Sequence, residues 1–441
     1  MSETPLEDPI SIIEFKSSKP LILAKEDVDY IKKNIQEGEG KKMDLDQQDG
    51  FYIITAKNFV GTIPLKHSKY PQISITPKAG QVNFIQMWGY TESIDTAKLF
   101  ENVNIQYGNS LADLMVKPFL GIVEPIIQEG IYKNYVTVIE QIPGVKGRLL
   151  LSQNIRSSHI THEKFWCEFD ERTADILENQ ILLYCAKLLS TRIISIDFKK
   201  ELYYFQHRLE IEGVSDVSIE PYHLDLISLQ KHNYHYKNAL DFCELILRYF
   251  GYGFQKGGMI PGSGHLYDMN NLFQNFVTKI LQESLPNQYD VFKEEEKKYF
   301  LNNISSQNPK LDGITPFQTE AMKPDIIIKK NKKDILVIDT KYKENTTKSD
   351  YYQSISYSLY SKCPVLLLLP QIDEKKASDF QINQSILNVD AKIFVRTIDF
   401  ESHSDQNYIK IMKNRILKTV YDIFEILGES PSQINDLNLL R

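Results

Sequence analysis

One short stretch limits what this chain of 441 residues can fold into. An apolar run, Ile335–Ile338, passes directly into Asp339-Thr340-Lys341. Consecutive aliphatic residues are typical of a strand that is buried on both faces of a sheet. Charged groups are costly to bury, so a strand of this kind rarely ends in a carboxylate and an ammonium group by chance. The sequence therefore predicts a site at the end of this strand.

A second carboxylate precedes the neighbouring strand. Residues 323–329 and 334–343 are predicted to form two strands around a polar turn, which would place Asp325 and Asp339 a few ångströms apart. Two buried carboxylates repel each other unless a cation lies between them, and Asp oxygens suit Mg²⁺. We therefore predict a Mg²⁺ site held by Asp325, Asp339 and the backbone carbonyl oxygen of Thr340, at which Mn²⁺ can substitute.

Lys341 and the next helix complete the predicted site. Side chains two positions apart in a strand share a face, so Lys341 is expected beside Asp339, where its ammonium group can hold an attacking water and stabilise charge on a phosphate. Residues 349–362 are predicted to form a helix with Gln353 and Tyr357 on one face. We expect Gln353 to be catalytic and Tyr357 to support it. The two side chains would brace Lys341 or contact a DNA backbone. A metal ion, a water and a lysine at a phosphate specify phosphodiester hydrolysis.

The rest of the chain is predicted to be a multidomain α/β protein with three consecutive regions. Residues 1–158 form a β-rich N-terminal region, residues 159–258 a helical connecting region, and residues 259–441 an α/β core. Residues 170–189 have the apolar spacing of a helix. The glycine-rich stretch 251–264 is the expected joint before the core.

A hairpin is predicted near residues 132–155, and its tip is a candidate interaction site. A β-branched run is followed by a glycine-rich turn that carries Lys146 and Arg148, and then by a second apolar run. A projecting basic tip would suit an acidic or phosphate-bearing partner. An ordinary solvated turn explains the same residues, and their spacing alone favours that interpretation.

Composition excludes several classes of protein. The chain is 42% hydrophobic and 25% charged, as in an ordinary globular protein. Its net charge of −7 does not indicate nucleic-acid binding, but a local basic patch can act within an acidic chain. Four scattered cysteines favour a reducing compartment, and the acidic N-terminus is not a signal peptide. No apolar run is long enough to span a membrane, so we expect a cytoplasmic protein.

The same motifs carry a resemblance to a known family. Pro324-Asp325, Asp339-Thr340-Lys341 and the pair Gln353 and Tyr357 resemble the PD-(D/E)xK nuclease superfamily, of the RecB-like kind with a Gln-xxx-Tyr helix. With their flanking residues they look more closely like McrC, the nuclease subunit of McrBC modification-dependent (type IV) restriction systems. The resemblance covers roughly residues 140–370, and residues 73–78 match more loosely.

The resemblance implies a C-terminal PD-(D/E)xK core and a Mg²⁺-dependent endonuclease that hydrolyses double-stranded DNA, expected to contain methylcytosine. It also implies a partner, a McrB-like hexameric AAA+ GTPase that binds the N-terminal region of this chain. The partner would recognise the modified base, and this chain would stimulate the partner's GTP hydrolysis. The hairpin tip with Lys146 and Arg148 becomes the candidate partner contact. No nucleotide is expected on this chain, which has no Gly-x-x-x-x-Gly-Lys-Ser/Thr loop. Cutting both DNA strands would be served by dimerisation of the complex.

One position departs from the pattern of the superfamily. Many RecB-like nucleases have an acidic residue on the helix before the hairpin, where this chain has Gln274. A glutamine can hold a metal-bound water but brings no negative charge; Glu283 and Glu320 are candidates to compensate. Two alternatives therefore stay open. One is a non-cleaving adaptor or activator of the AAA+ ring, and the other is a stand-alone RecB-like repair nuclease.

Overall fold

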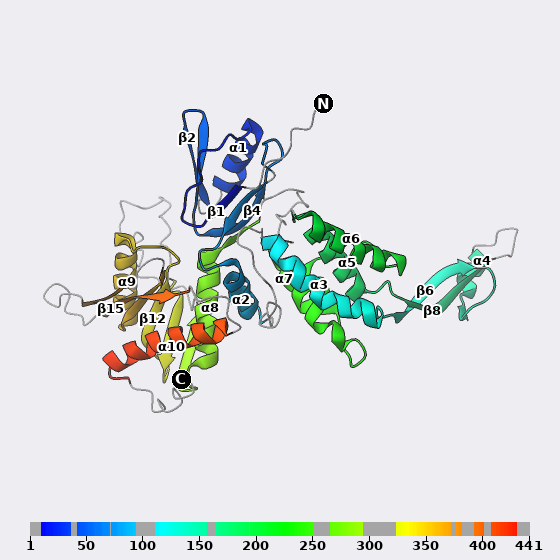
Figure 1. Cartoon of the computed structure of the whole chain (residues 1–441). Helices are drawn as coiled ribbons and strands as arrows, with labels where there is room; N and C mark the ends of the chain where they lie inside the picture. The colour runs from blue at the N-terminus through cyan, green and yellow to red at the C-terminus, as the bar shows by residue number, and fades with distance from the viewer. Residues whose placement is uncertain are drawn as a thin grey trace, which may run out of the picture. The chain divides into compact units, whose positions relative to one another are not determined.

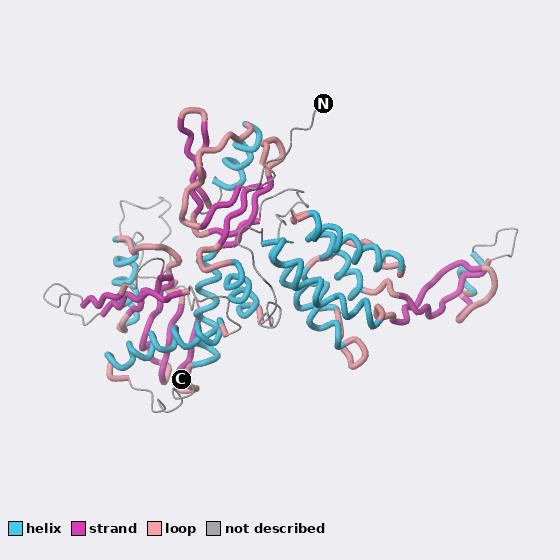
Figure 2. The backbone as a smooth tube through the Cα atoms, in the orientation of Figure 1, coloured by secondary structure: helices cyan, strands magenta, loops and turns pink. Residues whose placement is uncertain are grey.

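A computed structural model describes the chain over eleven segments, which are residues 10–36, 42–70, 72–93, 111–156, 164–193, 195–250, 265–293, 323–371, 376–381, 392–400 and 407–429. These segments belong to two compact units, one within residues 1–98 and 266–441 and the other within residues 99–265 (Figure 1). The mixed α/β class is as predicted (Figure 2). No described helix is long and apolar enough to cross a bilayer.

This division differs from the three consecutive regions predicted at 1–158, 159–258 and 259–441. The N-terminal strands join a strand far along the chain, so the first and last parts of the sequence form one unit. The region between them is a separate unit that includes the segment predicted as a hairpin. The glycine-rich stretch 251–264 lies outside the described residues.

The N-terminal part of the first unit is built on a four-stranded sheet of order β1-β5-β4-β9. Strand β1 pairs in parallel with β5, and β5 pairs antiparallel with β4. A separate hairpin of β2 and β3 packs its apolar side chains into the same core. The elements are β1 (Ile10–Ile13), α1 (Lys25–Ile31), the π-helix η1 (Lys32–Gln36), β2 (Met43–Gln48), β3 (Phe51–Ala56), β4 (Phe59–Pro64), β5 (Gln72–Thr76), α2 (Gln81–Thr91) and β9 (His265–Asp268).

The C-terminal part is a six-stranded mixed sheet of order β10-β11-β12-β13-β15-β14. Its central strands β12, β13 and β15 run parallel, and the outer pairs are antiparallel. The continuous apolar runs of β12 and β13 are buried, as central strands require. The elements are α8 (Met269–Ser284), β10 (Tyr289–Lys293), β11 (Ile326–Lys330), β12 (Lys333–Thr340), α9 (Lys348–Ser361), β13 (Val365–Gln371), β14 (Ala377–Gln381), β15 (Lys392–Asp399) and α10 (Tyr408–Ile426).

Local sequence explains the elements around the predicted site. The β11–β12 hairpin turns through Asn331 and Lys332, whose positive φ angles of 53° and 63° match the twist of a tight hairpin. Helix α9 begins with a capping box between Thr347 and Asp350. It ends where Lys362 adopts the left-handed conformation. The predicted hairpin strands and the predicted helix 349–362 are therefore confirmed.

The second unit combines helices with a three-stranded sheet of order β6-β8-β7. Helices α3, α5, α6 and α7 pack together. The base of the sheet is tied to them through Tyr236, whose hydroxyl donates to Asn179 at 2.8 Å and accepts from the Tyr132 backbone N–H at 3.0 Å. The elements are α3 (Leu111–Glu129), β6 (Asn134–Ile142), β7 (Arg148–Leu149), α4 (Leu151–Arg156), β8 (Phe165–Thr173), α5 (Leu177–Ser190), α6 (Ile196–Ile211), the 3₁₀ helices η3 (Pro221–Leu226) and η4 (Tyr234–Tyr236), and α7 (Lys237–Phe250).

Two predictions in this unit are wrong. The strands predicted to form a hairpin near 132–155 do not pair with each other, because β6 and β7 both pair with β8, which lies between them. Residues 170–173, predicted as the start of a helix, end strand β8 instead, and α5 begins only at Leu177. The nine-residue pairing of β6 with β8 supplies backbone hydrogen bonds that override the helical spacing.

One buried carboxyl group joins the two parts of the first unit through hydrogen bonds. Glu14, which follows β1, is fully buried and accepts a hydrogen bond from the Tyr342 hydroxyl at 2.6 Å. It also accepts the backbone N–H of Lys78 at 2.7 Å. Burial raises the pKa of Glu14 to about 7, although these two hydrogen bonds oppose the rise.

We predict that Glu14 makes the folded state less stable as the pH rises. A carboxyl group with a folded pKa of about 7 and an ordinary unfolded pKa of 4.5 contributes its full stability below pH 4.5 and loses it as the pH rises through 7. Between pH 4.5 and pH 8 the wild type should lose up to about 3 kcal/mol relative to E14Q. Urea unfolding of both proteins at pH 5 and pH 8 measures this difference, and parallel pH profiles would contradict it.

Candidate active site

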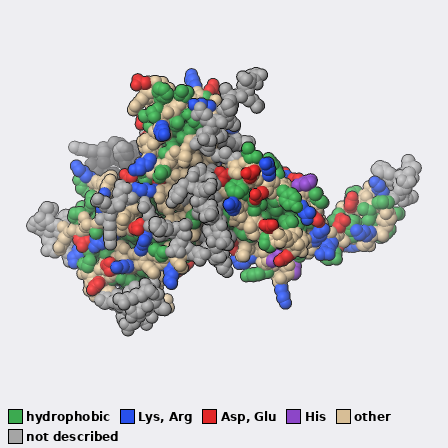
Figure 3. Space-filling view, viewed as in Figure 1, with side chains coloured by type: hydrophobic (Ala, Val, Ile, Leu, Met, Phe, Trp, Pro, Cys, Tyr) green, Lys and Arg blue, Asp and Glu red, His purple; other side chains and the backbone are tan. Residues whose placement is uncertain are grey.

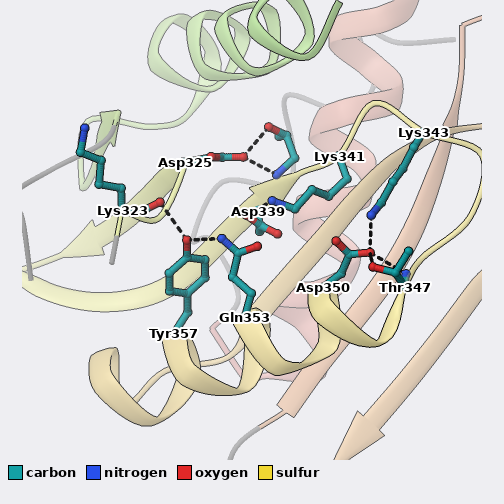
Figure 4. A network of polar contacts seen from close by, with 10 residues as sticks. Lys323, Asp325, Asp339, Lys341, Lys343, Thr347, Asp350, Gln353 and Tyr357 are labelled. Atoms are coloured by element: carbon teal, nitrogen blue, oxygen red, sulfur yellow. Dashed lines mark hydrogen bonds and ion pairs between the residues drawn. The ribbon is translucent and has the colours of Figure 1, made fainter. Parts of the chain in front are cut away.

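The strand register brings the two predicted carboxylates together. In the β11–β12 hairpin Ile326 pairs with Ile338, so the next pair toward the open end is Asp325 and Asp339. Val337 packs in a buried cluster with Tyr357 of α9. Because side chains alternate along a strand, Asp339 and Lys341 face α9 as Val337 does. Figure 4 shows these groups between the strand ends and α9.

Thr340 holds Asp325 in place. Its backbone N–H and its hydroxyl both donate to Oδ2 of Asp325 at 2.7 Å. The sequence predicts only a backbone carbonyl ligand from Thr340, so this role of its hydroxyl was not predicted. The residue type was the available signal, because a threonine beside two carboxylates can fix one of them through a short hydrogen bond.

Asp339 is the most unusual group in the site. It is fully buried, and neither of its carboxylate oxygens accepts a hydrogen bond of regular geometry from the described residues. Burial raises its pKa to about 7, and the nearby carboxylates of Asp325 and Asp350 act in the same direction. Buried polar atoms are rarely left unsatisfied, so this carboxylate is arranged for a positive partner.

Lys341 supplies part of that positive charge. Its Nζ lies 3.1 Å from Oδ1 of Asp339. The side chain of Lys341 is 23% exposed, so the ammonium group lies between the buried carboxylate and solvent. An ammonium group in this position can reach both an attacking water and a phosphate oxygen that approaches from solvent.

Gln353 and Tyr357 meet as their spacing predicted. The Gln353 amide donates to the Tyr357 hydroxyl at 2.7 Å, and this hydroxyl donates to the Lys323 carbonyl oxygen at 2.9 Å (Figure 4). The pair therefore braces the chain two residues before Asp325. Burial and the Asp339 charge raise the pKa of Tyr357, which keeps its hydroxyl protonated as a donor.

A second lysine–carboxylate pair, which was not predicted from the sequence, borders the site. Lys343 Nζ lies 2.5 Å from Oδ2 of Asp350, which also accepts the backbone N–H and the hydroxyl of Thr347. Burial works to raise the pKa of Asp350, but these partners hold it below its ordinary value. Asp350 therefore fixes Lys343 beside the start of α9 (Figure 4). The Thr347–Asp350 capping-box spacing was the available signal.

Two of the remaining candidate positions, Gln274 and Glu283, lie on α8. Gln274 is buried on α8, a helix that packs against β12, and its backbone carbonyl accepts the Thr278 hydroxyl at 2.7 Å. Glu283, considered as a compensating acid, is bound instead to the Tyr90 hydroxyl and to Lys413. Glu320 lies outside the described residues.

The residues present fit a divalent cation. Two carboxylates at the ends of paired strands form an oxygen-rich site of the kind that Mg²⁺ prefers; in one of them, Asp339, Oδ1 pairs only with Lys341 and Oδ2 has no partner among the described residues. No group of three or more His, Cys, Asp or Glu side chains suited to a metal occurs in the described residues. A hard cation that keeps several waters needs only one or two carboxylates, so this does not conflict with Mg²⁺.

The predicted partner contacts lie in the second unit. Arg148 begins β7, has a side chain that is 76% exposed and lies 3.3 Å from Oε2 of Glu168. Lys146 Nζ lies 4.0 Å from the centre of the Phe169 ring. Gly147 between them has a φ of +67°, and a Cβ atom there would lie 2.4 Å from the carbonyl oxygen of Glu168. This turn therefore requires glycine in order to approach β8.

Large hydrophobic side chains are exposed along the same sheet and on α4. The most exposed are Tyr135, Ile139, Val145, Leu151 and Ile155, each with more than half of its surface accessible. Green hydrophobic atoms are visible over this part of Figure 3, among interspersed basic and acidic side chains. Apolar residues gathered on one exposed element are typical of an interaction surface.

Comparison with known proteins identifies the class and then the family. Residues 54–369, more than half of the chain, match the family described as "McrBC 5-methylcytosine restriction system component". The chain is therefore a restriction-system component. It belongs to the McrBC 5-methylcytosine restriction system component family, as the resemblance of its motifs predicted.

Two relatives illustrate the similarity. The chain is 26% identical over 325 residues to the type IV methyl-directed restriction enzyme EcoKMcrBC of Escherichia coli K12, which covers 67% of this chain and 86% of the relative. Its fold is similar to a chain in the structure of Thermococcus gammatolerans McrB AAA+ hexamers with bound McrC. That match has a TM-score of 0.61 and 17% identity, and it covers 92% of this chain and 99% of the other.

We predict that D339N leaves the metal-free protein at least as stable as the wild type and abolishes its response to Mg²⁺. The substitution removes a buried carboxylate whose ionisation is disfavoured by burial and by Asp325, an effect that the Lys341 ammonium group offsets only in part. In the wild type, Mg²⁺ at about 100 times its Kd should add about 2.7 kcal/mol by mass action. Thermal unfolding at pH 8 with and without Mg²⁺ measures both effects.

The matched control is D379N. Asp379 lies on β14, which β13 and β15 separate from β12 in the sheet. Its half-exposed side chain pairs with Arg396, with 2.5 Å between Oδ1 and Nη1. The D379N protein should respond to Mg²⁺ as the wild type does. An equal Mg²⁺ response in D339N and the wild type would contradict the assignment of Asp339.

Proposed function

We propose that this chain is the Mg²⁺-dependent endonuclease subunit of a GTP-driven restriction complex. It would hydrolyse phosphodiester bonds in double-stranded DNA that contains methylcytosine, using a PD-(D/E)xK site of the RecB-like kind. The family description, which names 5-methylcytosine restriction, supports this substrate. The observation that carries the proposal is the convergence of Asp325, Asp339 and Lys341, with the buried Asp339 carboxylate paired only with Lys341 and accepting no regular hydrogen bond from the described residues.

The geometry supports a hydrolytic reaction at phosphorus. Asp325 and Asp339, with the Thr340 carbonyl, would hold Mg²⁺. The ion, when bound, would polarise the phosphate and favour deprotonation of an attacking water. Lys341 would hydrogen-bond the water and stabilise negative charge on a non-bridging phosphate oxygen. Thr340 keeps Asp325 in its orientation, and Gln353 with Tyr357 fixes the chain before it.

The same proposal includes an AAA+ partner. The similar solved structure is described as McrB AAA+ hexamers with bound McrC, and we infer that this chain also binds a McrB-like hexamer and stimulates its GTPase. The exposed apolar side chains and Arg148 on the β6-β8-β7 sheet support a contact there. The nucleotide would belong to the partner, and dimerisation of the complex would bring two nuclease sites to the two DNA strands.

Gln274 favours one alternative, a non-cleaving adaptor that engages the ring. It provides no negative charge on the buried face of α8, where many RecB-like nucleases have an acid. A complete set of Asp325, Asp339 and Lys341 argues against this alternative, because an adaptor has no need of a buried, unsatisfied carboxylate. A stand-alone repair nuclease would cut DNA ends without partner or GTP.

We predict that the chain, mixed with its McrB-like partner, GTP and Mg²⁺, cuts methylated DNA and leaves unmethylated DNA intact. D339N and K341M should each reduce the cleavage rate by at least about 100-fold, because each removes charge that acts on the transition state. D379N is the control for folding and should cut at the wild-type rate. GTPase stimulation without cleavage, in Mg²⁺ or Mn²⁺, would establish the adaptor instead.

We predict that R148E weakens stimulation of the partner GTPase and leaves the chain folded. The Arg148 ion pair is exposed, so its loss should change stability by no more than about 0.5 kcal/mol. K200E is the matched control, because Lys200 is a 74% exposed lysine on α6 of the same unit. Titration of the partner GTPase with each variant compares them, and equal loss in both would refute a specific role for Arg148.

A further inference from the structure

The residue that follows Lys341 is held by the N-terminal part of the chain. Tyr342 is 5% exposed, and its hydroxyl donates to Oε1 of Glu14 at 2.6 Å. Glu14 follows strand β1, more than three hundred residues earlier, and its own backbone N–H donates to the Thr76 carbonyl at 3.0 Å. The four-stranded N-terminal sheet therefore reaches directly to the end of the strand that carries Asp339.

Glu14 is unusual in the same way as Asp339. It is fully buried, and its Oε2 has no hydrogen-bond partner among the described residues. Both of its hydrogen bonds, from Tyr342 and from the Lys78 backbone N–H, are accepted by the other oxygen, Oε1. A small cavity lies beside it, lined also by Gln371 and Phe400. A carboxylate kept in this environment at a cost in desolvation needs a reason beyond packing.

The backbone at this contact is also strained. Phe15, next to Glu14, has a φ of +62°, which is unfavourable for a bulky residue. The centres of the Phe15 and Tyr342 rings are 6.0 Å apart, and the centres of the Phe273 and Tyr342 rings are 5.9 Å apart. Strain of this kind persists only where the surroundings fix it, and it gathers at functional sites.

These contacts limit the freedom of Lys341 on both sides. Its backbone N–H donates to the Leu368 carbonyl of β13 at 2.9 Å, which fixes the residue to the sheet. On its C-terminal side the chain leaves the strand, and Tyr342 is the next anchored residue. A displacement of Tyr342 would therefore move Lys341 relative to Asp339 more readily than it would move β12 itself.

We propose that Glu14 is a positioning residue for the nuclease site, acting through the Tyr342 hydroxyl on the placement of Lys341. This inference rests on the proposed function, because it assigns Lys341 to the reaction. The N-terminal sheet thereby becomes part of the machinery that aligns the lysine, in addition to any role in partner binding. A shift of that sheet would change the position of Lys341 through the hydrogen bond between Tyr342 and Glu14.

The test compares two buried tyrosines, of which only Tyr342 makes a hydrogen bond through its hydroxyl within the described residues. Y342F removes the hydroxyl that donates to Glu14. Y408F removes a hydroxyl that is equally buried, on α10, but has no hydrogen-bond partner among the described residues. E14A removes the acceptor, whereas E14Q keeps an oxygen where Oε1 accepts both hydrogen bonds. Cleavage kinetics of the full complex with methylated DNA then separate kcat from KM.

Misplacement of a reacting group by about 1 Å can cost about 100-fold in rate, so Y342F and E14A should lower kcat by about 10- to 100-fold. Their KM for DNA should stay within about threefold of the wild type, because binding contacts are unchanged. Y408F and E14Q should stay within about threefold in both constants. Equal kcat values for Y342F and Y408F would overturn the proposal, as would equal losses in E14Q and E14A.

Hydrogen exchange gives a readout that does not depend on cleavage. In Y342F and E14A, the backbone amides of residues 339–343 should exchange faster, while those of β13 keep their protection. E14Q and Y408F should match the wild type over both segments. If the wild-type complex cuts no DNA, the proposed function fails, and exchange still decides the positioning role. Unchanged exchange at residues 339–343 in Y342F would overturn it.

Discussion

A carboxylate buried at the end of a central strand is the constraint on which this structure depends. Asp339 is fully enclosed with neither oxygen satisfied by a regular hydrogen bond, so the fold must supply positive charge nearby or leave the group protonated. Asp325, beside the start of the neighbouring strand, adds a second negative charge. Lys341 neutralises part of this negative charge, and the part that remains makes the site suitable for a divalent cation, which could in turn bind a phosphate.

Local patterns predicted the elements that carry the site. The apolar run before Asp339, the polar turn at residues 330–333 and the spacing of Gln353 and Tyr357 each depend on a few neighbouring residues, and the structure reproduces all three. The prediction of a hairpin near 132–155 is wrong because β6 pairs with β8, whose residues lie beyond that segment. A helical spacing at residues 170–173 was likewise overridden by pairing with β6.

The residues that sequence reasoning missed are those whose partners are distant or whose role is indirect. Glu14 and Tyr342 are separated by most of the chain, so no local pattern relates them. Thr340 and Asp350 are near the motifs, but their contacts were not predicted: the Thr340 hydroxyl holds the predicted ligand Asp325, and the Asp350 carboxylate pairs with Lys343. Motifs therefore identified the carboxylates and the lysine that meet in the candidate site, whereas the residues that contact them from elsewhere in the chain required the three-dimensional structure.

The path of the chain from β9 into α8 affects whether a C-terminal fragment of this protein can fold by itself. Strand β9 is the edge of the N-terminal sheet beside β4, and Asp268 at its end caps α8 while accepting a hydrogen bond from Asn58. A fragment that begins near residue 266 would keep β9 without β4, exposing a bare strand edge that invites self-association. We therefore expect the C-terminal sheet not to fold independently when it is expressed alone. Its first helix, α8, is capped by Asp268, which is held by Asn58 of the N-terminal part.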